Sequence, residues 1–113
     1  MKFQEIIDKL GADVVHKGTR FDNAQLKNIV VSDMMSEVLT VDKDEILLLT
    51  SLSSHQTMRT VNNIGGLGVI IVNDSPIQFG LKELAKEFDI TLLKTELPAF
   101  EVCVALGQLL EQK

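Results

Sequence analysis

Short apolar runs alternate with segments of helical periodicity along most of the chain. The runs are rich in Ile, Val and Leu and predict strands at Leu26 to Val31, Ile46 to Thr50, Gly68 to Val72 and Ile90 to Leu93. Because each run is almost continuously apolar, it is typical of a parallel strand that is buried on both faces. The pattern therefore predicts an α/β fold: a single three-layer domain with a mostly parallel sheet of about four to five strands and helices on both faces.

The stretch from Glu45 to Val72 carries this pattern most completely. A buried strand leads into the serine-rich turn Ser51 to Ser54, a helix follows and ends near Gly65, and Gly68 begins the next strand. The glycines lie between a helix and a strand, so they predict a tight turn rather than a phosphate-binding loop, which would follow a strand. The stretch is therefore interpreted as a βαβ unit.

Further helices are predicted around this unit from apolar spacing and end signals. One runs from Lys2 to Leu10 and stops at Gly11, and the strand candidate Ala12 to Val15 follows it. The other three are expected directly after Val31 with Ser32 or Asp33 as cap, after Ser75 as cap with Pro76 as first residue, and from Pro98 towards Leu110.

Composition narrows the classes of function. Asp and Glu number 16 against 11 Lys and Arg, so the net charge of −5 argues against nucleic acid or an anionic membrane as a partner. No apolar run approaches the roughly 18 residues of a membrane span, and MKFQEIIDKL does not resemble a signal peptide. The single cysteine, Cys103, excludes an internal disulfide. We expect a cytoplasmic protein with one domain over residues 1–113 and a buried thiol.

Polar residues follow each predicted parallel strand. In an open parallel sheet, ligands bind beyond the carboxyl ends of the strands, where helix N-termini present free N–H groups. A small polar ligand such as a ribose or phosphate would meet the following candidate residues there: Ser32, Asp33, Thr50, Ser51, Ser53, Ser54, Asn73 and Thr95. The same residue types serve as ordinary helix caps and turn residues, so both interpretations stay open.

No catalytic or metal-binding constellation stands out. His16, His55 and Cys103 are isolated in the sequence, and no metal-ligand spacing links them. His55 is expected to face solvent from the first turn of its helix, and Arg59 either reaches an anionic group or lies on a solvated face. We therefore expect no catalytic residue, no metal and no cofactor.

The terminal helix has an unusual distribution of apolar residues. Between residues 102 and 106 almost no polar face is left, whereas a surface helix should show one apolar stripe. In a domain of this size, such a segment is either deeply buried or pairs with another subunit. We expect a homodimer formed through this helix, with contacts from Phe100, Val104, Leu106 and Leu110.

The order and spacing of several motifs resemble the DRTGG-domain family over most of the chain. The motifs are VVSDMMSEVL (30–39), LLLTSLSSHQTMRTV (47–61), VIIVND (69–74) and TELPAFEV (95–102). One departure concerns the Asp-Arg…Thr-Gly-Gly run that names the family. In its place this chain has residues 22–28, DNAQLKN, where Asp22 alone corresponds.

The resemblance implies a regulatory or ligand-sensing module without kinase chemistry. DRTGG domains are similar to the N-terminal domain of HPr kinase/phosphorylase, and they occur beside CBS domain pairs, which bind adenine nucleotides. The leading hypothesis is a non-catalytic module that binds a nucleotide-like anion at the strand C-termini. The alternatives are a protein-interaction subunit without a small ligand, for example of a redox or hydrogenase-type system, and a small hydrolase or transferase using Asp33 and Ser51.

Overall fold

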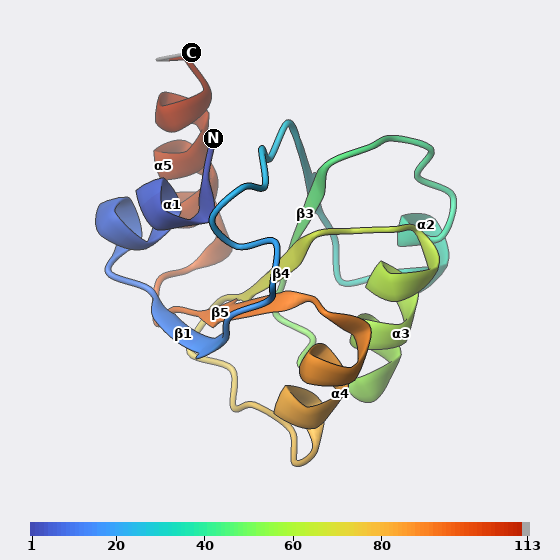
Figure 1. The fold of residues 1–113 in the computed structure, drawn as a ribbon. Helices are drawn as coiled ribbons and strands as arrows, with labels where there is room; N and C mark the ends of the chain where they lie inside the picture. Colours follow the sequence, from blue (N-terminus) through green and yellow to red (C-terminus); the bar gives the residue numbers. More distant parts are fainter. Residues whose placement is uncertain (112–113) are drawn as a thin grey trace.

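A five-stranded sheet forms the centre of the molecule (Figure 1). This computed structural model describes residues 1–111. The strand order is β1-β5-β4-β3-β2, in which β2 to β5 are parallel and β1 runs antiparallel to β5. The predicted mostly parallel α/β sheet is confirmed. The strands are β1 (Asp13–His16), β2 (Asn28–Val31), β3 (Ile46–Thr50), β4 (Gly68–Ile71) and β5 (Thr91–Lys94).

Helices cover both faces of the sheet, as the apolar runs predict. In Figure 1, α1 (Phe3–Leu10) and α5 (Ala99–Glu111) lie together on one side. The other side carries α2 (Met35–Val38), α3 (His55–Asn63) and α4 (Leu81–Phe88). Within residues 1–111, none of these helices has the length and apolarity needed to cross a membrane.

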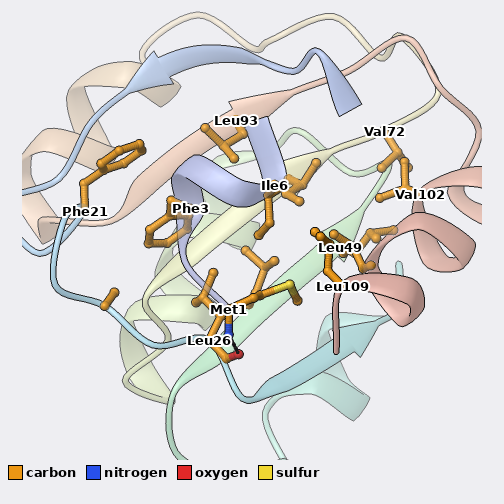
Figure 2. Packing of buried hydrophobic residues seen from close by; sticks show 14 residues of the cluster. Met1, Phe3, Ile6, Phe21, Leu26, Leu49, Val72, Leu93, Val102 and Leu109 are labelled. Atoms are coloured by element: carbon orange, nitrogen blue, oxygen red, sulfur yellow. Dashed lines mark hydrogen bonds between the residues drawn. The ribbon is translucent and has the colours of Figure 1, made fainter. Parts of the chain in front are cut away.

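Two apolar cores lie on opposite faces of the sheet. Every residue of β3 and β4 is buried, because each strand has neighbours on both sides and helices on both faces. Figure 2 shows the core beneath α1 and α5, where Phe3 and Ile6 pack towards the sheet and Val102 and Leu109 close it from α5. The rings of Phe3 and Phe21 stack with their centroids 5.5 Å apart, which joins the loop before β2 to this core.

Gly68, at the start of β4, allows α1 to pack closely on the sheet. A Cβ atom at this position would lie 2.5 Å from Cε1 of Phe3, which is shorter than any ordinary contact. Glycine therefore permits the Phe3 ring to sit directly against the strand.

The helix predicted after β4 begins later than expected. Its first residue is Leu81, and Ser75 and Pro76 lie in the preceding loop, so the predicted cap is wrong. Asn73 and Asp74 adopt left-handed backbone angles, with φ of 61° and 54°, and their amides donate to the carbonyls of Leu97 and Thr95. These two bonds hold the chain against the β5–α5 loop and delay the helix.

The predicted cap of α2 is also wrong. The N-cap position belongs to Met34, which makes no side-chain capping bond. Ser32 Oγ accepts from the Met34 amide at 3.0 Å in a local turn, while the Asp33 carboxylate turns towards β3 instead.

The terminal helix packs on its own sheet along one side. Val102, Leu106 and Leu109 are buried in the core, so Leu106, expected to contact a second subunit, packs within its own chain. Phe100, Val104 and Leu110 remain exposed at 77%, 45% and 37%, and they share the outer side of α5 with Glu101, Gln108 and Glu111. Cys103 is half-buried at the edge of the core rather than fully enclosed as expected.

Candidate functional site

Three parallel strands bring predicted polar residues to one edge of the sheet. Because β2, β3 and β4 end side by side, Ser32, Asp33, Thr50, Ser51 and Asn73 gather around one small hollow of about 130 Å³. Its remaining lining is apolar and comes from Val31, Leu49, Val72 and Ala99. We call it the edge hollow.

A second, more open hollow adjoins the first at Ser51. It measures about 340 Å³ and lies between the start of α3 and the loop that follows β4. We call it the α3 hollow; its lining residues are Ser51, Leu52, Ser53, Ser54, Ser75, Pro76 and Gln78. Together the two hollows reach the size of a small-molecule site, which the edge hollow does not reach alone.

Thr95 lies apart from the other predicted residues. It is buried at the end of β5, where its hydroxyl accepts from the Leu97 amide at 3.2 Å. The hollow beside it is lined by Leu10, Gly11, Asp13, Thr95, Glu96 and Leu97, none of which lines the edge hollow. The structure therefore brings seven of the eight candidate residues to the two adjoining hollows and leaves Thr95 outside them.

Asp33 organises the edge hollow through three hydrogen bonds. Its Oδ1 accepts from Thr50 Oγ1 at 2.6 Å and from the Ser51 amide at 2.7 Å, and its Oδ2 accepts from Ser51 Oγ at 2.5 Å. These bonds tie the end of β2 to the end of β3. They also orient the Thr50 and Ser51 hydroxyl hydrogens towards Asp33, so each oxygen offers a lone pair rather than a proton to a further group.

The same contacts determine the charge in the edge hollow. The side-chain hydroxyls of Ser51 and Thr50 hold the pKa of Asp33 below its ordinary value, and the Ser51 amide adds to this, while partial burial opposes it. Asp33 is therefore anionic at neutral pH. An ionised carboxylate repels phosphate and accepts hydrogen bonds, so this hollow suits a hydroxyl or an amino group.

The N-terminus of α3 gives the second hollow a different character. Ser54 is its N-cap, with Oγ accepting from the Thr57 amide at 3.3 Å, and the His55 amide donates to Gln78 Oε1 at 3.1 Å. No acidic residue stands in the first turn, so no carboxylate offsets the positive end of the helix dipole. This end of the site favours a negative group.

His55 and Arg59 differ in how they meet their surroundings. His55 is partly exposed, and its Nε2 lies 2.8 Å from the carbonyl oxygen of Phe79, so the ring is held against the loop before α4. Arg59 is exposed on α3 and lines neither hollow.

Several lining residues were not predicted from the sequence. Ala99 reaches the edge hollow because α5 begins beside β4, and Gln78 reaches the α3 hollow because residues 75–80 form a loop. Neither residue carries a local signal, since both positions depend on the packing of distant segments. Among residues 1–111, no three His, Cys, Asp or Glu side chains gather closely enough to hold a metal ion.

No family model and no curated protein matches the chain significantly. A solved structure does match: the CBS and DRTGG domains of the regulatory region of Clostridium perfringens pyrophosphatase, in complex with the activator diadenosine tetraphosphate. The TM-score is 0.77 at 18% sequence identity, over 95% of this chain and 46% of that chain. The two proteins share a fold.

This likeness agrees with the resemblance of the sequence motifs to the DRTGG-domain family. The chain spans less than half the length of that regulatory region. At this level of identity the similarity establishes the architecture, and any shared ligand is a matter for proposal.

Proposed function

We propose that this chain is a non-catalytic, ligand-sensing regulatory module that binds a nucleotide-like molecule across the edge hollow and the α3 hollow. The observation that carries the proposal is the junction at Ser51, where a hydrogen-bonding hollow meets the N-terminus of a helix. Both features lie at the carboxyl ends of parallel strands, the usual place for a ligand in such a sheet.

The different charges of the two hollows indicate how a nucleotide would be oriented in the site. The Asp33 carboxylate suits the ribose hydroxyls or an exocyclic amino group and disfavours phosphate. The α3 hollow lies beside the positive end of a helix whose first turn has no acidic residue, so phosphate oxygens are favoured there. The nucleoside end therefore enters the edge hollow and the anionic end points towards Ser53 and Ser54.

The structural neighbour supports the same ligand class. Its regulatory region is complexed with diadenosine tetraphosphate, an adenine nucleotide that acts as its activator. Adenine nucleotides are therefore the first molecules to test on this chain.

Calorimetric titration of the purified chain with AMP, ADP, ATP and diadenosine tetraphosphate tests the proposal. We expect saturable binding by at least one of them. Ala99→Leu adds bulk to the edge hollow without touching the Asp33 bonds and should weaken binding about tenfold or more. Val104→Leu lies on the exposed side of the same helix and should bind as the unmodified chain does. If none of the four nucleotides binds, the proposal of a nucleotide-like ligand is refuted.

A protein-interaction subunit remains the second candidate, favoured by the exposed apolar residues of the α2 region. Met34 is 55% exposed and Leu39 is 50% exposed, and they flank the four-residue helix α2. A pull-down with the unmodified chain and with Met34→Lys distinguishes the two functions. A stoichiometric partner that is lost in Met34→Lys, combined with absent nucleotide binding, favours the interaction subunit.

The enzyme alternative has less support. A general base should have a pKa near neutral pH, whereas hydrogen bonds lower the pKa of Asp33 and so make it a weaker base. His55, which a Ser-His-Asp arrangement would need beside Ser51, contacts the Phe79 carbonyl instead.

A further inference from the structure

One edge of the sheet is open along β2. Within residues 1–111, this strand is last in the sheet order and pairs with β3 alone. The Asn28 amide donates to the Glu45 carbonyl at 3.3 Å and the Ser32 amide to the Leu49 carbonyl at 3.2 Å. Alternate residues of a strand bond to the same neighbour, so Ile29 and Val31 direct their backbone N–H and C=O groups away from the sheet.

The open edge is apolar and lies beside a groove under α5. The groove has a volume of about 180 Å³ and is lined by Ile29, Val31, Cys103, Leu106, Gly107 and Leu110. Val31 is 50% exposed. Exposed edge strands usually carry a charged residue, a proline or a bulge that prevents pairing with another chain. The segment Asn28–Val31 has no charged residue and no proline, and its pairing with β3 is regular.

We propose that a second copy of this chain pairs antiparallel with β2, so that two sheets join across a two-fold axis at Val30. In this register Ile29 lies opposite Val31 of the partner subunit, and Val31 lies opposite Ile29 of the partner subunit. Each opposed pair exchanges two backbone hydrogen bonds, using the groups that point away from β3. The register is self-complementary, as a two-fold interface requires.

Charge complementarity selects this register. This register places Lys27, just before β2, opposite Asp33 of the partner subunit. Because the interface is two-fold, the same Lys–Asp pair forms once on each side of the axis. Lys27 is 69% exposed, and its ion pair with Glu45 Oε2 is long at 3.7 Å, so the flexible side chain can exchange it for a carboxylate of the partner subunit at hydrogen-bond distance. Asp33 is exposed just past the end of β2, and its ionised carboxylate, which accepts from Thr50 and Ser51, can accept a further bond at Oδ2.

The dimer has two further consequences. The partner's Lys27 brings a positive charge to the rim of the edge hollow, where Asp33 is the charged lining residue. The two-fold axis also puts both α5 helices on the same face of the joined sheet. Leu110, which is 37% exposed and lines the groove beside β2, then faces the axis from each subunit.

Disulfide trapping tests the register directly. In a Cys103→Ala background, Val30→Cys places two thiols on the axis in a non-hydrogen-bonded pair, with Cα atoms roughly 4.5 Å apart, which a disulfide can span. Val31→Cys is the matched control, because its two thiols would be offset by two residues and lie roughly 8 Å or more apart. We expect a covalent dimer on a non-reducing gel for Val30→Cys only. Trapping of Val31→Cys alone, or of neither variant, overturns the proposal.

Sedimentation equilibrium tests the interface without a new thiol. Val31→Pro removes an N–H that points away from β3 and so leaves the internal ladder intact. It should raise the dimer dissociation constant about tenfold or more, while Val31→Thr keeps the N–H and should stay within about threefold of the unmodified chain. Circular dichroism checks that both variants are folded. A monomer at every concentration, or equal dissociation constants for Val31→Pro and Val31→Thr, contradicts pairing through β2.

Discussion

The carboxylate of Asp33 accepts a hydrogen bond of 2.6 Å from the hydroxyl of Thr50, and this bond joins the ends of β2 and β3. Thr50 is buried, and its oxygen in turn accepts from the Leu52 amide at 3.1 Å. The pair therefore fixes the course of the chain where the two hollows meet. A residue that resembles a helix cap in the sequence acts as a link between strands.

Removing the charge of Asp33 should weaken this link. Asp33→Asn keeps the shape of the side chain but loses charge-assisted bonds to Thr50 and Ser51, so we expect a loss of about 1 kcal/mol in the free energy of unfolding. Urea denaturation at pH 7 measures it. Asp42→Asn, in the exposed loop before β3, makes the same charge change and should cost almost nothing. Equal effects of the two substitutions would show that the link contributes nothing.

The link should also depend on pH. Because the folded pKa of Asp33 is below the ordinary value of about 3.9, its contribution is fully present above that ordinary value and is lost as pH falls through the folded pKa. The stability difference between the unmodified chain and Asp33→Asn should therefore be constant from about pH 7 to 5 and shrink below about pH 4. A difference that stays constant to about pH 2 would contradict the lowered pKa.

Asp89 forms a second link, between the end of α4 and the loop after β1. Its carboxylate accepts from the Thr19 hydroxyl at 2.5 Å and from the Thr19 amide at 2.8 Å, and its backbone is left-handed with a φ of 57°. Asp89→Asn should cost about 1 kcal/mol through the lost bonds. Asp89→Ala should cost roughly 1 kcal/mol more, since alanine tolerates this backbone less well than asparagine. Thermal denaturation ranks them, and equal melting temperatures for the two variants would contradict the backbone argument.

Two glycines should respond oppositely to alanine. Gly68→Ala drives a methyl group into the Phe3 ring, so we expect a loss of about 1–3 kcal/mol. Gly107 lies inside α5, and no atom of residues 1–111 outside the helix backbone comes within 4 Å of its added Cβ, so Gly107→Ala should stabilise by about 0.5–1 kcal/mol. Urea denaturation compares both with the unmodified chain. Stabilisation by Gly68→Ala would show that α1 does not pack on the sheet this closely.

A negative charge introduced at residue 78 should lower nucleotide affinity without lowering the stability of the fold. Gln78→Glu places a carboxylate at the α3 N-terminus, where it accepts from the His55 amide and favours the helix dipole, so stability should be retained. The same carboxylate repels phosphate in the α3 hollow, so nucleotide affinity should fall about tenfold. Gln25→Glu, exposed in the loop before β2, is the control with an equal charge change. Unchanged affinity in Gln78→Glu would contradict the proposed ligand orientation.

The sequence predicts most of the sheet because the buried strands are nearly continuous apolar runs. The predicted strand Ile46 to Thr50 has the same bounds as β3. This strand is buried between two other strands and under helices on both faces, so almost every residue in it is apolar. The start of α4 is predicted too early because Ser75 and Pro76 carry strong local signals that the bonds of Asn73 and Asp74 to the β5–α5 loop override. The approach of Ala99 and Gln78 to the hollows depends on tertiary packing alone.

Amide chemical-shift mapping on titration with adenine nucleotides tests the central claim most directly. Binding across the two hollows should shift the amides of Ser32, Ser51 and Ser54 and leave those of Asp13 and Glu96, beside the separate Thr95 hollow, unchanged. Shifts confined to the Thr95 hollow, or no shifts with any nucleotide, would contradict a ligand site at the ends of β2 and β3.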